Sequence, residues 1–490
     1  MSFDLVFFGG TGDLTWRKLM PALFQAWRHG KLPTHGRILA VARDERTDAS
    51  YRQWLQDKLA SGDDLAKRPT EDEFERFAAL VHYLCMDLSR PGDYSSLRQW
   101  LAARQADTVV MYLATSPHLF PIICEQLGAA GLNHPGVRVV LEKPLGHDLA
   151  SAQAINRAVG AVFSERQALR IDHYLGKPSV QNLMALRFGN VLFEPLWRRE
   201  SIANIQITLA ESLGVGTRGD FYDRTGALRD MIQNHALQLL TMVAMEPPSS
   251  ADADAIRDEK LKVLRSLKPF DAASVARDVV RGQYRAGTVG GVSVPGYLDE
   301  AKVPPGSSTE TFVALRCEIQ NWRWAGVPFY LRTGKRLARR HAEIVVNFRP
   351  TPHSIFPGAQ SPNQLVIKLQ PDDGLQLHLL AAKGALGPDP AAGHQAEHLS
   401  PVSLDLDFDK AFPTDRVGAY ERMLLDALAG RLNLFVRSDE QEQAWRWVEP
   451  ILEAWRHDAS GLKTYSAGTW GPAAASALVA RDGFAWAEES

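Results

Sequence analysis

The start of the chain restricts the fold more than any other part, because the mostly apolar run FDLVFF (3–8) leads directly into GGTGDL (9–14). The run predicts a buried strand, and the periodicity of the following DLTWRKLMPALFQAW predicts a helix. Gly9 and Gly12 in the turn allow the backbone to approach a pyrophosphate, which the helix N-terminus then stabilises. This order of elements predicts a dinucleotide-binding domain, although the Gly-x-x-Gly spacing by itself also fits an ordinary tight turn.

Four more apolar runs follow, separated by helix-like sequence: RILAVA (37–42), VHYLCM (81–86), TVVMYLA (108–114) and VRVVLE (137–142). Apolar strands that alternate with helices predict a parallel sheet covered on both faces. After residue 178 the pattern changes, and IANIQITLA (202–210) alternates apolar with polar residues, as strands of antiparallel sheets do. We therefore expect an α/β Rossmann-type domain at 1–178 and an α+β domain with a large, mostly antiparallel sheet at 179–490.

Charge and cysteine content exclude several classes of protein. The 490 residues carry 55 Lys and Arg against 57 Asp and Glu, without a long basic block, so neither nucleic acid nor a membrane is an expected partner. The three cysteines, Cys85, Cys124 and Cys317, form no CxxC pair, which argues against disulfides and a metal site. No secretory signal and no bilayer-spanning apolar run is visible, so a cytoplasmic location is expected.

Two basic residues follow predicted strands. Arg43 comes directly after the second strand, at the place where an acidic residue would favour NAD. An arginine suits a 2′-phosphate, so the sequence favours NADP as the cofactor, with NAD as the weaker alternative. Lys143 in LEKPLG (141–146) follows another strand, at the carboxyl end where open α/β sheets bind ligands. An ordinary strand-ending turn explains LEKPLG equally well.

The string IDHYLGK (171–177) brings together Asp172, His173, Tyr174 and Lys177. Asp172 and His173 fit a catalytic dyad, whereas the histidine, tyrosine and lysine fit a loop that binds an anion. Adjacent residues on an extended segment point to opposite sides, which favours separate roles for Asp172 and His173.

Two later segments carry further candidate residues. In GALRDMIQNH (226–235), Asp230 and Asn234 are four positions apart and share one face of the expected helix, and His235 comes next. A single histidine on a helix is more often structural than catalytic. Lys335 ends the strand-like run VPFYLRTGK (327–335) in a basic cluster, for which a solvated surface is the default explanation.

Four long strings occur in order along the chain: EKPLG, RIDHYLGK, GALRDMIQNH and NWRWAGVPFYLRTGKRL. With them the chain resembles the glucose-6-phosphate dehydrogenase family, and the resemblance runs from GGTGDLTWRKLMPALF to YSAGTWGP (465–472). It implies oxidation of glucose 6-phosphate at C1 to the 1,5-lactone with reduction of NADP, the first step of the oxidative pentose phosphate pathway. It also implies a homodimer or homotetramer that assembles through the large sheet.

The resemblance assigns roles to individual residues. His235 would be the catalytic base and Asp172 the carboxylate that orients it, while His173, Tyr174 and Lys177 would hold the 6-phosphate. The other substrate contacts would be Lys143, Glu211, Asp230, Lys335 and Arg340. The dinucleotide contacts would be Gly9, Gly12, Asp13, Leu14, Lys18, Arg43, Asp87, Leu88 and Lys143.

Two residues depart from the family pattern on the cofactor side. Trp16 stands where relatives usually carry a basic or small residue, and Ser116-Pro117 replaces their usual Pro-Pro. These departures bear on coenzyme preference and leave the proton-transfer residues untouched.

Two other functions stay open. One is a sugar dehydrogenase of the glucose–fructose-oxidoreductase type, which shares a Rossmann domain and an EKP turn but lacks the IDHYLGK string. The other is a catalytically inactive dinucleotide-sensing protein, against which the joint presence of Asp172, His235 and Lys335 argues.

Overall fold

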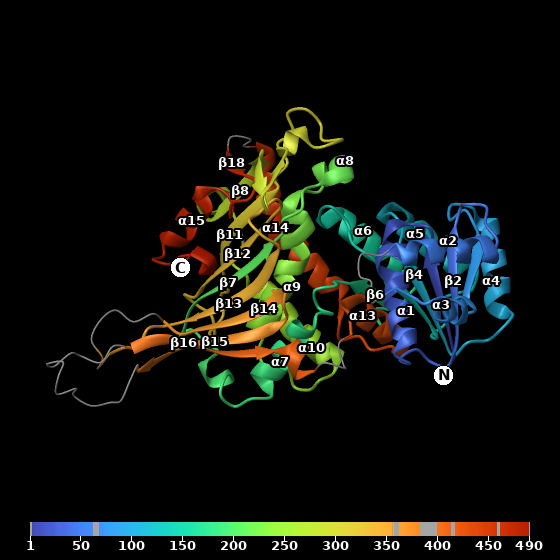
Figure 1. Cartoon of the computed structure of the whole chain (residues 1–490), viewed down its shortest axis with the longest axis horizontal. Coiled ribbons are helices and arrows are strands. Elements are labelled where there is room, and N and C mark those ends of the chain that lie inside the picture. Colours follow the sequence, from blue (N-terminus) through green and yellow to red (C-terminus); the bar gives the residue numbers. More distant parts are fainter. Residues whose placement is uncertain are drawn as a thin grey trace. The chain divides into compact units, whose positions relative to one another are not determined.

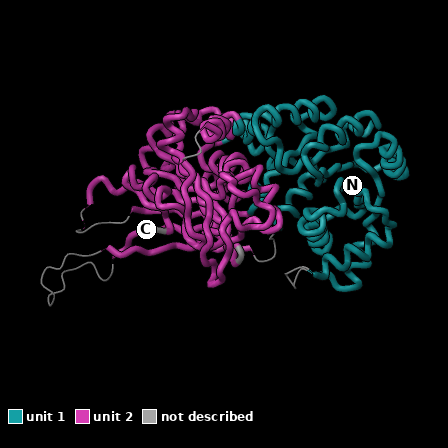
Figure 2. The backbone as a smooth tube through the Cα atoms, turned by 90° about the horizontal axis from the view of Figure 1, so that it is seen from above, with its two compact units in different colours: residues 1–177, 248–259, 417–445 teal, residues 178–247, 260–416, 446–490 magenta. Residues whose placement is uncertain are grey.

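The computed structural model of the chain describes residues 2–61, 68–354, 356, 362–382, 399–412, 417–457 and 461–489. The backbone forms two compact units (Figure 2). Unit 1 comprises residues 1–177, 248–259 and 417–445, and unit 2 comprises 178–247, 260–416 and 446–490. The domain boundary expected after residue 178 stays a prediction. Among the described helices, none combines the length and apolar character needed to cross a membrane.

Unit 1 is built on a seven-stranded sheet in the order β17-β6-β5-β4-β1-β2-β3. Figure 1 labels its strands β2, β4 and β6. All neighbours pair in parallel except β17, which pairs antiparallel with β6. This order is that of a Rossmann-type sheet, as predicted. The strands are β1 (Ser2–Phe8), β2 (His35–Ala42), β3 (Val81–Cys85), β4 (Thr108–Leu113), β5 (Val137–Leu141), β6 (Ala168–Ile171) and β17 (Phe435–Val436).

Both faces of this sheet are covered, because successive residues of β1 enter different cores. Phe3, Leu5 and Phe7 belong to one buried cluster, and Val6 and Phe8 belong to another. The first cluster takes residues from α1 (Met20–Arg28), α2 (Asp48–Ala60), α3 (Glu71–Ala78) and α13 (Ala419–Ala429). The second takes residues from α4 (Tyr94–Ala102), α5 (Phe120–Ala129) and α6 (Leu149–Gly160).

The glycine-rich turn after β1 needs its glycines for steric reasons. Gly9 has a φ of +89°, and a Cβ there would lie 2.5 Å from the carbonyl oxygen of Ala114. A Cβ on Gly10 would lie 2.6 Å from the Cβ of Ala40. The turn closes through a hydrogen bond from the Gly12 N–H to the Gly9 carbonyl, 2.9 Å long. The chain then enters η1 (Thr15–Leu19), a π-helical turn that continues into α1.

Unit 2 is built on a nine-stranded sheet in the order β16-β15-β14-β13-β7-β12-β11-β8-β18. Only β12 with β7 and β18 with β8 pair in parallel among its described strands, so the sheet is mostly antiparallel, as predicted. The strands are β7 (Ile202–Ala210), β8 (Val279–Arg285), β11 (Phe312–Glu318), β12 (Pro328–Gly334), β13 (His341–Phe348), β14 (Gln364–Gln370), β15 (Gly374–Ala382), β16 (Leu399–Asp407) and β18 (Leu462–Ser466).

Helices and one small hairpin complete the described part of the chain. The hairpin consists of β9 (Gly287–Val289) and β10 (Val292–Val294). The remaining described α- and π-helices are α7 (Pro178–Phe188), α8 (Gly219–Asp223), η7 (Leu228–Ala236), α9 (Leu237–Ala244), α10 (Ala253–Ser266), α11 (Ala272–Asp278), α12 (Phe408–Ala411), α14 (Ser438–His457) and α15 (Ala473–Ala480).

The alternating strand β7 is buried on both faces. Ile205 and Ile207 are fully buried, as their face of the pattern predicts, but Gln206 on the other face is only 2% exposed. The C-terminal segment covers this polar face, because the Gln206 side-chain amide donates to the Ala485 carbonyl (2.8 Å) and accepts from the Ala487 N–H (3.0 Å). The polar residues of β7 therefore bind protein groups in place of water.

Candidate active site

The cofactor residues expected in unit 1 all follow the carboxyl ends of parallel strands. Gly9 and Gly12 follow β1, Arg43 follows β2, Asp87 follows β3 and Lys143 follows β5. Strand β1 lies between β2 and β4, where the strand order reverses direction. Open α/β sheets bind their ligands at such a switch point, so the sheet brings these candidates to the edge where a dinucleotide binds.

The turn itself fits a pyrophosphate. Gly9 and Gly10 leave no room for side chains, so the backbone is bare where phosphates would approach. Asp13, Lys18 and Arg43 are exposed at this edge, and Leu14 is half-buried. Two cationic side chains and a glycine turn supply the charge and the close approach that an anionic dinucleotide requires.

Trp16 organises the residues around the turn. Its indole Nε1 donates to Asp13 Oδ1 at 3.2 Å, while the Arg17 guanidinium carbon and Lys58 Nζ lie 4.7 and 4.8 Å from its ring centroid. The aromatic face thus holds two cations beside the helix start. This departure from the family pattern thus places a neutral aromatic ring, in contact with Arg17 and Lys58, beside the turn.

Asp87 and Leu88 differ in what they offer a ligand. The Asp87 carboxylate accepts from the side chain and backbone of Ser89 at 2.7 and 3.0 Å. These hydrogen bonds, helped by Arg90 and Arg43, lower the pKa of Asp87 below its usual value. The Leu88 side chain is buried in the core, so only its backbone is available to a cofactor.

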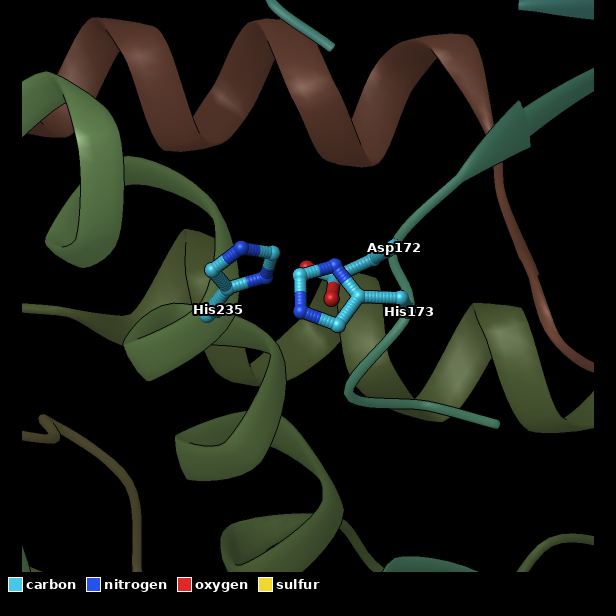
Figure 3. A group of neighbouring side chains, drawn as sticks. All are labelled: Asp172, His173 and His235. Atoms are coloured by element: carbon cyan, nitrogen blue, oxygen red, sulfur yellow. The ribbon is translucent and has the colours of Figure 1, made fainter. Parts of the chain in front are cut away.

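The string after β6 is a turn, and this corrects the expectation that it is extended. The Tyr174 N–H donates to Asp172 Oδ1 (3.0 Å), and the Leu175 and Lys177 N–H groups each donate to the backbone carbonyl three positions earlier. A carboxylate oxygen of Asp172 and a ring nitrogen of His173 consequently lie within 4.8 Å of each other, on the same segment (Figure 3). Because a turn replaces the strand geometry, the rule that neighbours point to opposite sides does not apply here.

Within unit 1, Tyr420 lies against His173. The two rings stack with centroids 5.8 Å apart and an interplanar angle of 12°. Lys177 Nζ of the same segment lies 4.8 Å from the centroid of the Tyr174 ring. Tyr420 belongs to α13, 247 positions after His173 in the chain, so no local pattern identifies it.

A buried acid that the sequence analysis did not single out lies beside Lys143. Tyr112 Oη donates to Glu142 Oε1 at 2.5 Å, and both side chains are buried. Burial raises the pKa of Glu142, against the opposing effect of the Tyr112 hydrogen bond and the Lys143 charge. The sequence could have indicated Glu142 only through its position directly before Lys143 in LEKPLG.

Unit 2 brings three predicted substrate residues together. Lys335 Nζ donates to Glu211 Oε2 at 2.6 Å and lies 3.8 Å from Asp230 Oδ2. Glu211 and Lys335 follow the parallel neighbours β7 and β12, so they meet at the same edge of the sheet. Lys335 Nζ also lies 4.9 Å from the centroid of Tyr222. We call Glu211, Asp230 and Lys335 the hydroxyl-binding cluster, because a cation and two carboxylates offer donors and acceptors to a polyol.

Tyr222 contacts this cluster through its ring, which lies near Lys335. This residue was not identified from the sequence. It is 5% exposed, and burial, with the charges of Asp230, Glu310 and Glu211 among its neighbours, raises its pKa well above the usual value. The phenol therefore stays neutral and provides an aromatic face to Lys335.

His235 lies on η7, which is a π-helix and not the α-helix expected from the spacing of Asp230 and Asn234. In a π-helix the hydrogen bonds run from residue i to i+5, so each turn holds an additional residue. This winding brings His235, five positions after Asp230, toward the face that the α-helical pattern gave to Asn234. The imidazole is fully buried and emerges from η7 in Figure 3. Such π-helical turns occur frequently at functional sites.

Arg340 differs from Lys335 in its exposure to solvent. It is exposed and directly precedes β13, five positions beyond Lys335. No metal ligand set was expected for the chain, and the proposed chemistry requires none.

Comparison with known proteins agrees with both parts of the fold. Residues 6–182 match the family model described as glucose-6-phosphate dehydrogenase, NAD binding domain, and residues 184–487 match the model described as glucose-6-phosphate dehydrogenase, C-terminal domain. Glucose-6-phosphate 1-dehydrogenase of Mycolicibacterium smegmatis is 50% identical over 492 residues, covering 99% of this chain and 97% of the relative. The enzyme of Rhizobium meliloti is 48% identical over 491 residues, with coverages of 99% and 97%.

Solved structures agree with these sequence relatives. A glucose-6-phosphate dehydrogenase in complex with its substrate glucose-6-phosphate superposes with a TM-score of 0.89 at 32% identity, covering 99% of this chain and 98% of the other. Glucose-6-phosphate 1-dehydrogenase from Mycobacterium avium superposes with a TM-score of 0.83 at 37% identity, with the same coverages. Family models and relatives that span almost the whole chain confirm the resemblance seen in the sequence: the chain belongs to the glucose-6-phosphate dehydrogenase family.

Proposed function

We propose that this chain is an oxidoreductase that converts D-glucose 6-phosphate at C1 to 6-phospho-D-glucono-1,5-lactone and reduces a nicotinamide dinucleotide. The observation that carries the proposal is the hydroxyl-binding cluster, in which Lys335 lies 2.6 Å from Glu211 and 3.8 Å from Asp230 in a member of this family. The reaction is the first step of the oxidative pentose phosphate pathway.

Proton removal is assigned to His235. Oxidising the C1 hydroxyl requires loss of its proton as the hydride leaves, and a neutral imidazole is suited to take that proton. Asp172 is proposed to orient this imidazole and to stabilise its protonated form. The full burial of His235 on η7 supports the assignment, since a buried imidazole keeps one orientation and is shielded from bulk water.

The 6-phosphate is assigned to His173, Tyr174 and Lys177. Support comes from the turn after β6, which gathers an imidazole, a phenol and an ammonium group on one short segment. Several donors, one of them charged, match an anion with several acceptor oxygens. Glu211, Asp230, Lys335, Lys143 and Arg340 are proposed as the remaining contacts to the sugar.

NADP is the proposed cofactor, and Arg43 is the residue expected to select it. Replacing Arg43 with alanine should raise the KM for NADP about tenfold, because one charge-assisted hydrogen bond to the 2′-phosphate is lost. Steady-state kinetics with both coenzymes measure the effect, and NAD serves as the internal control because it lacks the 2′-phosphate. An equal loss with NAD and NADP would contradict a role in selection.

The proposed activity is tested directly by NADPH absorbance. Adding glucose 6-phosphate to the protein and NADP should give a steady increase, whereas free glucose at the same concentration should give little. A response to both sugars alike would favour a sugar dehydrogenase without a phosphate site. Binding of NADP without turnover of the phosphate ester would favour a dinucleotide-sensing protein and would contradict the proposal.

Assembly as a homodimer or homotetramer, through the large sheet, is proposed together with a cytoplasmic location. Support for the assembly comes from β16, an edge strand of the sheet. Val402, Leu404 and Leu406 occupy alternate positions of β16 and are 42%, 61% and 47% exposed. Alternate residues share one face of a strand, so these side chains form a continuous apolar row that a second copy of the chain would cover.

A further inference from the structure

The start of η7 lacks a local cap. The first N–H groups of a helix have no partners within the helix, and a side chain just before it usually accepts from them. The helical segment enters η7 through Gly226 and Ala227, and neither residue has a side-chain acceptor. The helix nevertheless carries Asp230 and His235, two residues whose placement matters for the proposed reaction.

Glu310, a residue distant in sequence, supplies the missing acceptors. Its carbonyl accepts from the Ala227 N–H at 3.0 Å, and its carboxylate Oε1 accepts from the Leu228 N–H at 3.0 Å. The side chain is 5% exposed and lies two positions before β11. A carboxylate at a helix N-terminus also interacts favourably with the helix dipole.

Gly226 makes room for this carboxyl group. Its φ is +72°, and a Cβ added there would overlap the Glu310 carboxyl. Burial raises the pKa of Glu310, while the Leu228 N–H, its own N–H, Arg229 and Arg281 favour the charged form. Backbone donors on η7 and on its own segment, together with the charges of Arg229 and Arg281, thus act on this acid.

Thr311, the next residue, connects the same segment to Lys335. The Lys335 N–H donates to the Thr311 carbonyl at 2.9 Å, and Tyr465 Oη donates to the Lys335 carbonyl at 2.6 Å. The Thr311 N–H in turn donates to the Gly282 carbonyl of β8 at 2.8 Å. Two consecutive residues therefore contact the helix that carries Asp230 and the strand end that carries Lys335.

We propose that Glu310 is a positioning residue, which fixes the start of η7 relative to Lys335 and so holds the hydroxyl-binding cluster in its substrate-ready geometry. The expected effect of this role on kinetics rests on the proposed function. Its structural part, the capping of η7, can be measured without the reaction.

The test compares three variants of the full-length protein. Glu310→Ala removes the side-chain acceptor, and should lower kcat/KM for glucose 6-phosphate about tenfold through a higher KM and a lower kcat, as expected for a buried donor left without its partner. Glu310→Gln keeps an acceptor oxygen and should stay within about threefold of the parent protein. The KM for NADP should change by less than about twofold in both, because the dinucleotide site lies on the unit 1 sheet.

Glu318→Ala is the matched control. Glu318 ends the same strand, β11, and pairs with Arg316 and Lys268 at 2.6 and 3.3 Å. Its loss should affect thermal stability but not the KM for glucose 6-phosphate. If Glu310→Ala does not fold, Gly226→Ala provides the second variant, because its Cβ displaces the carboxyl group, and the same pattern of KM and kcat is expected.

Hydrogen exchange separates the two parts of the proposal. The Leu228 amide should exchange at least about tenfold faster in Glu310→Ala than in Glu310→Gln. Faster exchange in a protein that never oxidises glucose 6-phosphate would support the cap and contradict the proposed function. Unchanged kinetics in Glu310→Ala with only a lower melting temperature, or equal losses in the alanine and glutamine variants, would overturn the positioning role.

Discussion

Replacing His235 with asparagine should lower kcat by a factor of about 10² to 10⁴, the usual contribution of a positioned general base. Asparagine is close in size and polar, but it cannot accept the C1 hydroxyl proton near neutral pH. The KM for glucose 6-phosphate should change little, because the side chain acts on the proton and not on the phosphate. Steady-state rates with saturating NADP measure both constants.

His341→Asn is a suitable control for this substitution. His341 also belongs to unit 2 and pairs with Glu343 at 2.9 Å, but it starts β13 and has no assigned role in catalysis. It should keep kcat within about twofold of the parent, as surface and peripheral substitutions usually do. A His235→Asn variant with normal kcat and a raised KM would show that this histidine binds the substrate and does not move the proton.

Replacing His173 with asparagine should have the opposite effect and raise the KM for glucose 6-phosphate about 10- to 100-fold, with a smaller change in kcat. The estimate corresponds to the loss of one hydrogen bond to a charged group. The substitution also removes the ring that stacks on Tyr420. Initial rates over a wide range of substrate concentrations give both constants.

Free glucose provides the internal control for His173. It has no phosphate, so its low kcat/KM should be the same in the parent protein and the His173→Asn variant. The ratio of kcat/KM for glucose 6-phosphate to kcat/KM for free glucose should therefore fall by the same factor as kcat/KM for glucose 6-phosphate itself. A proportional loss with both sugars would mean that His173 shapes the site in general and does not recognise the phosphate.

Local sequence patterns predicted five of the seven strands of the first sheet, β1 to β5, and missed β6 and β17. FDLVFF, RILAVA and the later apolar runs each became a parallel strand, and the residues after them came to one edge of the sheet, because parallel strands share the direction of their carboxyl ends. The mostly antiparallel second sheet was also predicted correctly from the alternation in β7.

Features that depend on distant segments were not predictable in this way. Alternation in β7 predicted a polar face but not its partners, Ala485 and Ala487, which lie 279 and 281 positions after Gln206. Glu310 caps a helix 82 positions away from it. No local pattern specifies such partners, since each arises only when the sheet is assembled.

Local geometry was also missed where the backbone departs from regular elements. The turn after β6 brought Asp172 and His173 to one side, whereas alternation along a strand separates neighbours. The π-helix of η7 changed which residue follows Asp230 around the helix. Both departures involve residues with proposed catalytic or binding roles, where sequence rules are expected to fail most often.

The composition of unit 1 has a consequence for how the protein is made. Its sheet gains β17, and its core gains Met423 and Leu424 of α13, from a segment synthesised some 250 residues after β6. A nascent chain that has just released β6 lacks these parts, and the apolar surface that α13 covers stays exposed while unit 2 is translated. Chains normally fold domain by domain as they are synthesised. Here the first domain to be synthesised is completed almost last, so chaperone binding during translation should concentrate on the face that waits for α13.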